Sequence, residues 1–184
     1  GHAFLGSALS SLGGGAEQIA GQYKRFLVGR DPLDREYIMQ KLGGWAMGST
    51  MPVIGAIDVA LWDLAGKAAG VPIHKLMGSY RSSVPAYASS VVFETPEQYA
   101  EEAVSYKERG WTAYKIHPPG DPRLDVKICE ATRAAVGDDY RLMLDSTWSY
   151  DYPNALHVGR AIEALNFYWY EDPLVEEDIY NYIK

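Results

Sequence analysis

The chain has 184 residues, of which 47% are hydrophobic and 22% are charged, a composition typical of globular proteins that bury a core. Its formal net charge of −7 and its lack of a Lys/Arg cluster argue against a nucleic-acid partner. No run of about 18 apolar residues is present, so no membrane span is expected, and the single cysteine, Cys129, suits a reducing compartment such as the cytoplasm.

Two helices are predicted in the first 83 residues. Residues 16–28 can form a short helix. A clearer one spans 53–69, VIGAIDVALWDLAGKAA, where apolar residues recur at helical spacing and make one stripe. Pro52 suits the first turn of this helix, and Gly70 suits its end.

From residue 84 onward, the sequence predicts alternating strands and helices. The strands are expected at 84–92, 111–117, 140–148 and 167–174, and the helices at 95–109 after the capping sequence TPEQ, 121–136, 151–166 and from 175. The strands are apolar on both faces, as parallel strands covered by helices are. This rhythm fits both a (β/α) barrel and an open doubly wound sheet.

Polar side chains stand at the C-terminal ends of successive predicted strands. Lys115 and His117 end one strand, Asp145 the next and Glu171 the one after. Several strands that each contribute one group at this edge favour a barrel, of which four strands are half. An open nucleotide-binding module would need a glycine-rich turn after its first strand, and residues 88–94, ASSVVFE, contain no glycine.

These strand-end residues suggest a metal-assisted proton transfer. Adjacent parallel strands lie about 4.8 Å apart, so Asp145 and Glu171 can hold one ion, and carboxylate oxygens suit Mg²⁺. Lys115 and His117 share a face because strand side chains alternate. A base beside a carboxylate-bound Mg²⁺ is what abstraction of a proton α to a carboxylate requires, since the metal neutralises the enediolate. Taken singly, each residue has a structural alternative, as a helix cap or a solvated lysine.

Several motifs together resemble one protein family. The stretches IGAIDVALWDLAGKAAGVPIHKLMG, VPAYAS, YKIH, LMLDS and WYEDP are similar to the enolase superfamily, specifically its mandelate racemase/muconate-lactonising group, from about residue 45 to the end. The resemblance implies an α/β fold with a TIM-type (β/α) barrel. Residues 84–184 would be its first four βα units, and residues 1–83 the C-terminal part of an α+β capping domain, with GHAF at 1–4 resembling the end of a strand. Relatives are about twice as long, so the chain is expected to be part of a larger enzyme.

The resemblance also implies roles for individual residues. Asp145 and Glu171 match the first two metal ligands, and Lys115 matches the first lysine of the family's KxK motif, which helps to bind the substrate carboxylate. His117 stands where the second lysine, usually the base, would be. Because imidazole is a general base near neutral pH, His117 can take that role, or it can hydrogen-bond substrate hydroxyls. Thr147 is a further departure, since many relatives carry asparagine there.

The function expected from these features is a Mg²⁺-dependent enzyme that removes the α-proton of a small hydroxy-carboxylate. Dehydration of an acid sugar is preferred, because tyrosines and polar groups near the site suit a polyhydroxylated substrate, and Trp148 and Tyr150 are expected to shape its pocket. Racemisation or epimerisation of a 2-hydroxy acid is the alternative. A catalytically inactive relative that serves binding or assembly is a rival from another class. The resemblance further implies a homo-oligomer, whereas the composition argues against a nucleic-acid or membrane partner.

Overall fold

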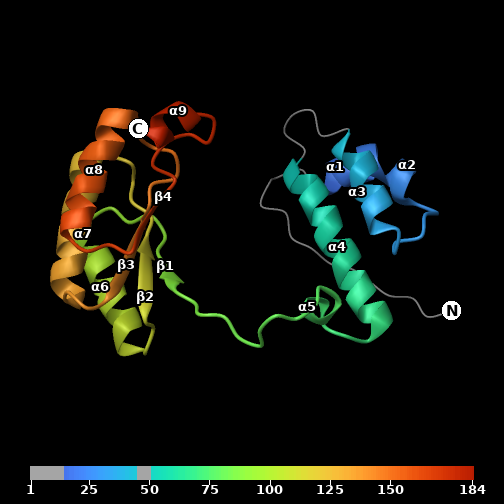
Figure 1. The fold of residues 1–184 in the computed structure, drawn as a ribbon, viewed down its shortest axis with the longest axis horizontal. Coiled ribbons are helices and arrows are strands. Elements are labelled where there is room, and N and C mark those ends of the chain that lie inside the picture. Colours follow the sequence, from blue (N-terminus) through green and yellow to red (C-terminus); the bar gives the residue numbers. More distant parts are fainter. Residues whose placement is uncertain (1–14, 45–50) are drawn as a thin grey trace. The chain divides into compact units, whose positions relative to one another are not determined.

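The structure, a computed structural model, describes residues 15–44 and 51–184, and the chain divides into two compact units, 1–83 and 84–184 (Figure 1). Residues 1–4, which resemble the end of a strand, lie outside the described residues. Within the described ranges, none of the helices combines the length and apolar character needed to cross a bilayer.

The described part of the N-terminal unit consists of helices. They are α1 (Gly15–Gln18), the π-helical turn η1 (Ile19–Tyr23), α2 (Lys24–Leu27), α3 (Arg35–Gly43), α4 (Met51–Ala69) and α5 (Ile73–Leu76). The predicted helix over 53–69 is confirmed as α4. The helix predicted at 16–28 is present as three short consecutive segments, and α3 was not predicted, because only two of its side chains, Ile38 and Leu42, are buried.

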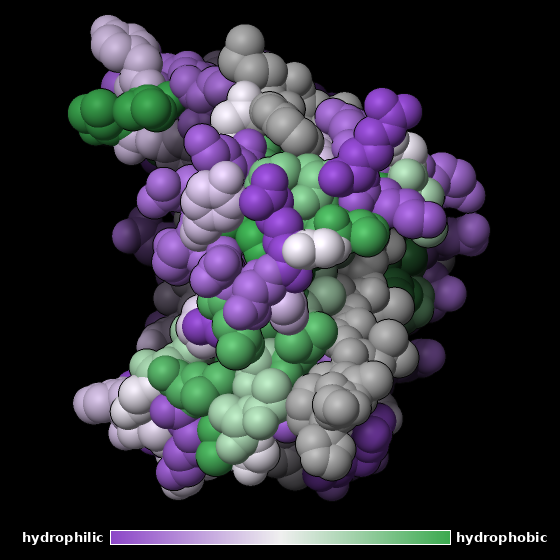
Figure 2. Space-filling view, turned by 90° about the vertical axis from the view of Figure 1, so that its right-hand side faces the viewer, coloured by the Kyte–Doolittle hydropathy of each residue, from purple (hydrophilic) through white to green (hydrophobic). Residues whose placement is uncertain are grey.

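An apolar cluster holds this unit together. Val53 and Ile57 of α4, one turn apart on the predicted stripe, are buried with Tyr23, Ile38 and Leu42. Removing these side chains from water is the main favourable contribution to the packing of α3 on α4. Other apolar side chains of the chain remain at the surface, and the face drawn in Figure 2 shows apolar patches among polar side chains.

The C-terminal unit alternates strands and helices in the predicted order. Its elements are β1 (Ala88–Ser89), α6 (Pro96–Glu108), β2 (Ala113–Ile116), α7 (Pro122–Val136), β3 (Arg141–Asp145), α8 (Tyr152–Ala164), β4 (Trp169–Glu171) and α9 (Ile179–Ile183). The strands form one four-stranded sheet in the order β1-β2-β3-β4, and every neighbouring pair is parallel. Helices α6, α7 and α8 lie on the same side of this sheet (Figure 1). A doubly wound sheet carries helices on both faces, so this arrangement is that of a (β/α) barrel.

The local signals for helix ends are confirmed in detail. Thr95 and Gln98 form a capping box at the start of α6. The carboxylate of Asp121 accepts from two backbone N–H groups at the start of α7, and Gly137 ends that helix with a φ of 82°. The last helix starts later than predicted, because Glu176 and Glu177 form a turn and Asp178 is the N-cap.

The strands are shorter than predicted. The expected strand at 84–92 is reduced to Ala88–Ser89, and the one at 140–148 ends at Asp145. The chain turns away after β3 because Thr147 and Trp148 have φ values of 47° and 60°, in the left-handed region. Loops therefore begin directly after Asp145, at the edge where the predicted site lies.

A buried arginine joins the two loops that precede β3 and β4. Arg133 of α7 is 5% exposed, and its guanidinium donates to the carbonyl oxygens of Gly137 at 2.7 Å and Tyr140 at 2.6 Å. It also donates to the carbonyl oxygens of Leu165 at 2.9 Å and Asn166 at 3.1 Å. The guanidinium suits this task, because its five N–H donors are held in a fixed plane and can reach several carbonyl oxygens at once.

Candidate active site

The two faces of the sheet have different roles. Tyr114 and Leu142 point into the core beneath the helices. Because strand side chains alternate, Lys115, Asp145 and Glu171 project from the opposite face. Asp145 and Glu171 are Cα partners in the β3–β4 register, so their side chains stand next to each other.

The structure brings the four predicted strand-end residues together. The ammonium nitrogen Nζ of Lys115 lies 2.8 Å from Oδ2 of Asp145 and 3.1 Å from both carboxylate oxygens of Glu171. The ring nitrogen Nε2 of His117 lies 2.8 Å from the same Oδ2 of Asp145. Two carboxylates, an ammonium and an imidazole therefore form one continuous cluster at the C-terminal edge of the sheet.

The charges in this cluster stabilise one another. Lys115 and Asp145 are each only 7% exposed. Burial by itself would lower the pKa of Lys115, but its hydrogen bonds to Asp145 and Glu171 outweigh this effect and raise the pKa. Burial would likewise raise the pKa of Asp145, but the hydrogen bond and charge of Lys115 outweigh it and lower the pKa. Both groups are therefore charged near neutral pH.

His117 is held at both its ring and its backbone. The ring nitrogen Nδ1 lies 3.0 Å from the carbonyl oxygen of Ser90 and 3.3 Å from the hydroxyl of Ser89. The backbone N–H of His117 donates to the Ser90 hydroxyl at 2.8 Å, and its carbonyl accepts from the buried Tyr99 hydroxyl at 2.8 Å. A carbonyl oxygen only accepts, so Nδ1 donates a hydrogen to Ser90. The carboxylate oxygen of Asp145 also only accepts, so Nε2 donates as well in this arrangement, and the ring acts as a base on Nε2 only when that nitrogen has lost its hydrogen.

The second oxygen of Asp145 is fixed by the loop that follows it. Oδ1 accepts from the backbone N–H of Thr147 at 3.1 Å and from its hydroxyl at 3.3 Å. Thr147 makes these contacts from a φ of 47°, and Asp172, directly after Glu171, has the same φ. Such conformations cost about 1–3 kcal/mol for residues other than glycine, and they cluster at functional sites.

The two residues predicted to shape the pocket lie in different places. Trp148 is in the loop after β3, is 45% exposed, and lines a cavity of about 260 Å³ with Val175, Glu176 and Glu177. Tyr150 is 6% exposed, and its hydroxyl donates to the carboxylate of Asp125 on α7. The structure therefore places Tyr150 in the core under the helices, on the opposite side of the sheet from the four clustered residues.

Sequence reasoning missed two aromatic residues beside the cluster. Trp169 donates from its indole nitrogen to Glu171, and the ring of Tyr87 faces the ammonium of Lys115. The signal was available, because Trp169 is two positions before Glu171 and so shares its face. It was overlooked because an aromatic residue in an apolar run is usually part of the core.

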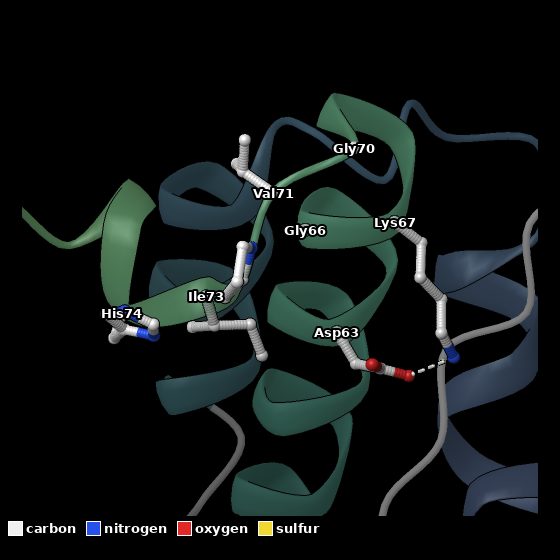
Figure 3. A pocket seen from close by; sticks show the side chains of 8 residues that line it. Asp63, Gly66, Lys67, Gly70, Val71, Ile73 and His74 are labelled. Carbon is white, nitrogen blue, oxygen red and sulfur yellow. Dashed lines mark hydrogen bonds and ion pairs between the residues drawn. The ribbon is translucent and has the colours of Figure 1, made fainter. Parts of the chain in front are cut away.

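A separate cavity of about 540 Å³ lies in the N-terminal unit, between the end of α4 and α5 (Figure 3). Its charged lining residues Asp63 and Lys67 pair with each other at 2.6 Å. The turn is tight here, since a Cβ on Gly66 would lie 3.0 Å from the carbonyl oxygen of Val71. An ion pair of this kind, one helical turn apart at the surface, contributes little to stability. We therefore place the candidate active site at the edge of the sheet.

Comparisons with known proteins agree with this geometry. Residues 5–78 match the family described as mandelate racemase/muconate lactonizing enzyme, N-terminal domain, and residues 98–184 match the enolase C-terminal domain-like family. The chain belongs to the mandelate racemase/muconate lactonizing enzyme group of the enolase superfamily. The match starts at residue 5, earlier than the motifs in the sequence indicated.

Among its relatives is the L-talarate/galactarate dehydratase of Salmonella typhimurium, 37% identical, which aligns with 83% of this chain and 40% of its own length. The D-xylonate dehydratase of Haloferax volcanii is 32% identical over 95% of this chain and 48% of its own. The crystal structure of D-glucarate dehydratase from Agrobacterium tumefaciens complexed with magnesium has a TM-score of 0.80 and 38% identity, over 90% of this chain and 48% of that one. Cycloisomerases, at 31% and 32% identity, and a racemase, at 31%, also occur among the relatives. The chain thus spans less than half the length of these three dehydratases.

The carboxylates of this superfamily member fit a Mg²⁺ ion. Asp145 and Glu171 both accept from one ammonium, that of Lys115, so their oxygens already converge on a single cation. Proteins commonly hold Mg²⁺ with one or two carboxylates, and water and substrate oxygens complete the shell. Among the described residues, no group of three or more His, Cys, Asp or Glu side chains is arranged to hold a metal.

Proposed function

We propose that this protein is a Mg²⁺-dependent enzyme that removes the α-proton of a small hydroxy-carboxylate, with dehydration of an acid sugar as the outcome. The observation that carries the proposal is the convergence of Lys115, His117, Asp145 and Glu171 at one edge of a parallel sheet. The dehydratases among its relatives support the choice of an acid sugar.

Each residue has a distinct task in this proposal. Asp145 and Glu171 hold the ion, which when bound supplies positive charge to the substrate carboxylate as negative charge develops there. The ammonium of Lys115 pairs with that carboxylate and orients the α-carbon. His117, with a neutral ring, takes the α-proton on Nε2, because Nδ1 keeps its hydrogen on the Ser90 carbonyl.

The electron pair of the broken C–H bond then moves into the substrate carboxylate. In a dehydratase, the pair returns to form a carbon–carbon double bond as the β-hydroxyl leaves with a proton as water, and the resulting enol becomes a 2-keto acid. In a racemase or epimerase, the α-carbon instead regains a proton. Both outcomes share the first step, so His117 and Lys115 have the same roles in each.

The test uses the full-length protein with Mg²⁺ and a library of sugar acids in deuterated water. Exchange of the α-proton is followed by NMR together with product formation, for wild type and for His117→Gln. A matched control is His157→Gln, which alters an exposed histidine on α8. We expect the His117 variant to lose at least 100-fold in both exchange and product formation, the range associated with a general base, and the control to match wild type.

Three other results would be decisive. Exchange without loss of water would replace dehydration by racemisation or epimerisation. Full activity in the His117 variant would show that another residue is the base. Mg²⁺ binding by wild type with no exchange on any acid would overturn the enzymatic proposal in favour of a binding or assembly role.

A further inference from the structure

Two aromatic rings lie directly beside the charged cluster, on the inner face of the sheet, which is the face that carries Lys115, Asp145 and Glu171. Tyr87 immediately precedes β1, and Trp169 is the first residue of β4. Their ring centroids are 5.3 Å apart, at an interplanar angle of 78°, which is an edge-to-face contact. β1 and β4 are the two outermost strands of the sheet, so this contact bridges its two ends across the inner face.

The aromatic pair is connected to the charged cluster at both ends. The indole nitrogen Nε1 of Trp169 donates to Oε2 of Glu171 at 3.0 Å. The ammonium of Lys115 lies 5.6 Å from the centroid of the Tyr87 ring, within the range of a cation–π contact. Lys115 itself donates to Glu171, so the four side chains form a closed circuit of contacts.

Glu171 depends on this circuit more than Asp145 does. The side chain of Asp145 is 10% exposed, and its second oxygen is fixed by the backbone and hydroxyl of Thr147. The side chain of Glu171 is 36% exposed and has one more rotatable bond. Its contacts to Lys115 and Trp169 are therefore what select its orientation.

The indole is well suited to this task. An indole N–H can only donate, so it points one carboxylate oxygen in a fixed direction, and the negative charge of the acceptor strengthens the bond. Unlike a lysine, the indole brings no positive charge that would oppose a cation. Hydrogen-bond partners of this kind around metal-binding carboxylates typically contribute 10–100-fold to metal affinity.

We propose that Trp169 is a positioning residue that orients Glu171 for a divalent cation, and that the ring of Tyr87 holds the indole in place. The inference rests on the proposed function, because it takes Glu171 as a ligand of Mg²⁺. It adds two residues that act through Glu171 and need not touch the substrate.

The test is calorimetric titration of the full-length protein with Mg²⁺ alone, which reports binding without turnover. Trp169→Phe keeps an aromatic ring but removes the donor, and we expect it to weaken Mg²⁺ binding by about 10-fold. Trp111→Phe is the matched control, because it makes the same chemical change in an indole that packs edge-on against Tyr106 in the helix-side core. This control is expected to bind Mg²⁺ as wild type does.

Two variants of Tyr87 test the second half of the inference and remain available if Trp169→Phe does not fold. Tyr87→Phe keeps the ring and should bind Mg²⁺ as wild type does, whereas Tyr87→Ala should bind several-fold more weakly. A Trp169→Phe variant that binds as tightly as wild type, while Glu171→Gln loses binding, would overturn the inference and leave the proposed function intact. Wild type that binds no Mg²⁺ would instead overturn the metal site, and both proposals with it.

Discussion

Replacing Asp125 by asparagine is expected to remove a pH-dependent loss of stability from this protein. Asp125 lies on α7, is fully buried, and accepts a hydrogen bond from the hydroxyl of Tyr150. Burial raises the pKa of its carboxyl group to about 6, from an ordinary value of 3.8, because the charged form loses hydration that one hydrogen bond does not replace. The folded state therefore holds this proton to a higher pH than the unfolded state does.

The magnitude follows from that difference. A shift of about two pKa units, at about 1.4 kcal/mol each, corresponds to about 3 kcal/mol. Below pH 3.8 both states are protonated and there is no penalty. Between pH 3.8 and about 6 the folded state of the wild type binds more protons than the unfolded state, so its stability falls as the pH rises, and it levels off above that range.

The assay is urea unfolding of the full-length protein at several pH values between 4 and 7.5, with the midpoint and slope recorded at each. Asp125→Asn keeps an oxygen that can accept from Tyr150, and any penalty for burying its amide is independent of pH. Glu130→Gln, which alters an exposed acid of the same helix, is the matched control. Across this pH range, we expect the free energy of unfolding of Asp125→Asn to rise by about 3 kcal/mol relative to that of wild type. The free energy of unfolding of Glu130→Gln should change with pH as that of wild type does. If the free energy of unfolding had the same pH dependence in wild type and in Asp125→Asn, burial of the Asp125 carboxyl group would be refuted as the cause.

Three further substitutions test the connections around β3. Arg133→Met should lower the free energy of unfolding by at least about 3 kcal/mol, because it leaves carbonyls of two loops without donors, and urea unfolding measures this loss. Gly120→Ala should destabilise by more than Gly110→Ala, since both glycines have positive φ, 93° and 87°, but only at Gly120 would a Cβ meet a side chain, 2.9 Å from Ser149. Equal shifts of the thermal midpoint in these two glycine variants would show that the contact with Ser149 carries no energy.

Much of the fold was accessible from the sequence because its signals act over short distances. The apolar stripe of α4 depends on residues three and four positions apart, and the capping box of Thr95 and Gln98 depends on residues of one turn. The cluster of Lys115, Asp145 and Glu171 was also predictable, because parallel strands bring their carboxyl ends to one edge whatever lies between them. The ends of the strands were harder to predict. The left-handed conformation after β3 is adopted by Thr147, and threonine, unlike glycine, is not a sequence signal for that conformation.

The sequence by itself determined the periodicity of the elements and their caps, because these depend on neighbours in the chain. It also determined the edge at which the charged residues gather, because parallel strands bring their carboxyl ends to one edge. Only the tertiary structure decided that Tyr150 turns into the helix-side core to meet Asp125, and that Trp169 donates to Glu171. Such partners are chosen by the register of neighbouring strands and by the packing of helices on one face of the sheet. The same tyrosine or tryptophan can face the core or the site, and a shift of one residue along a strand exchanges the two.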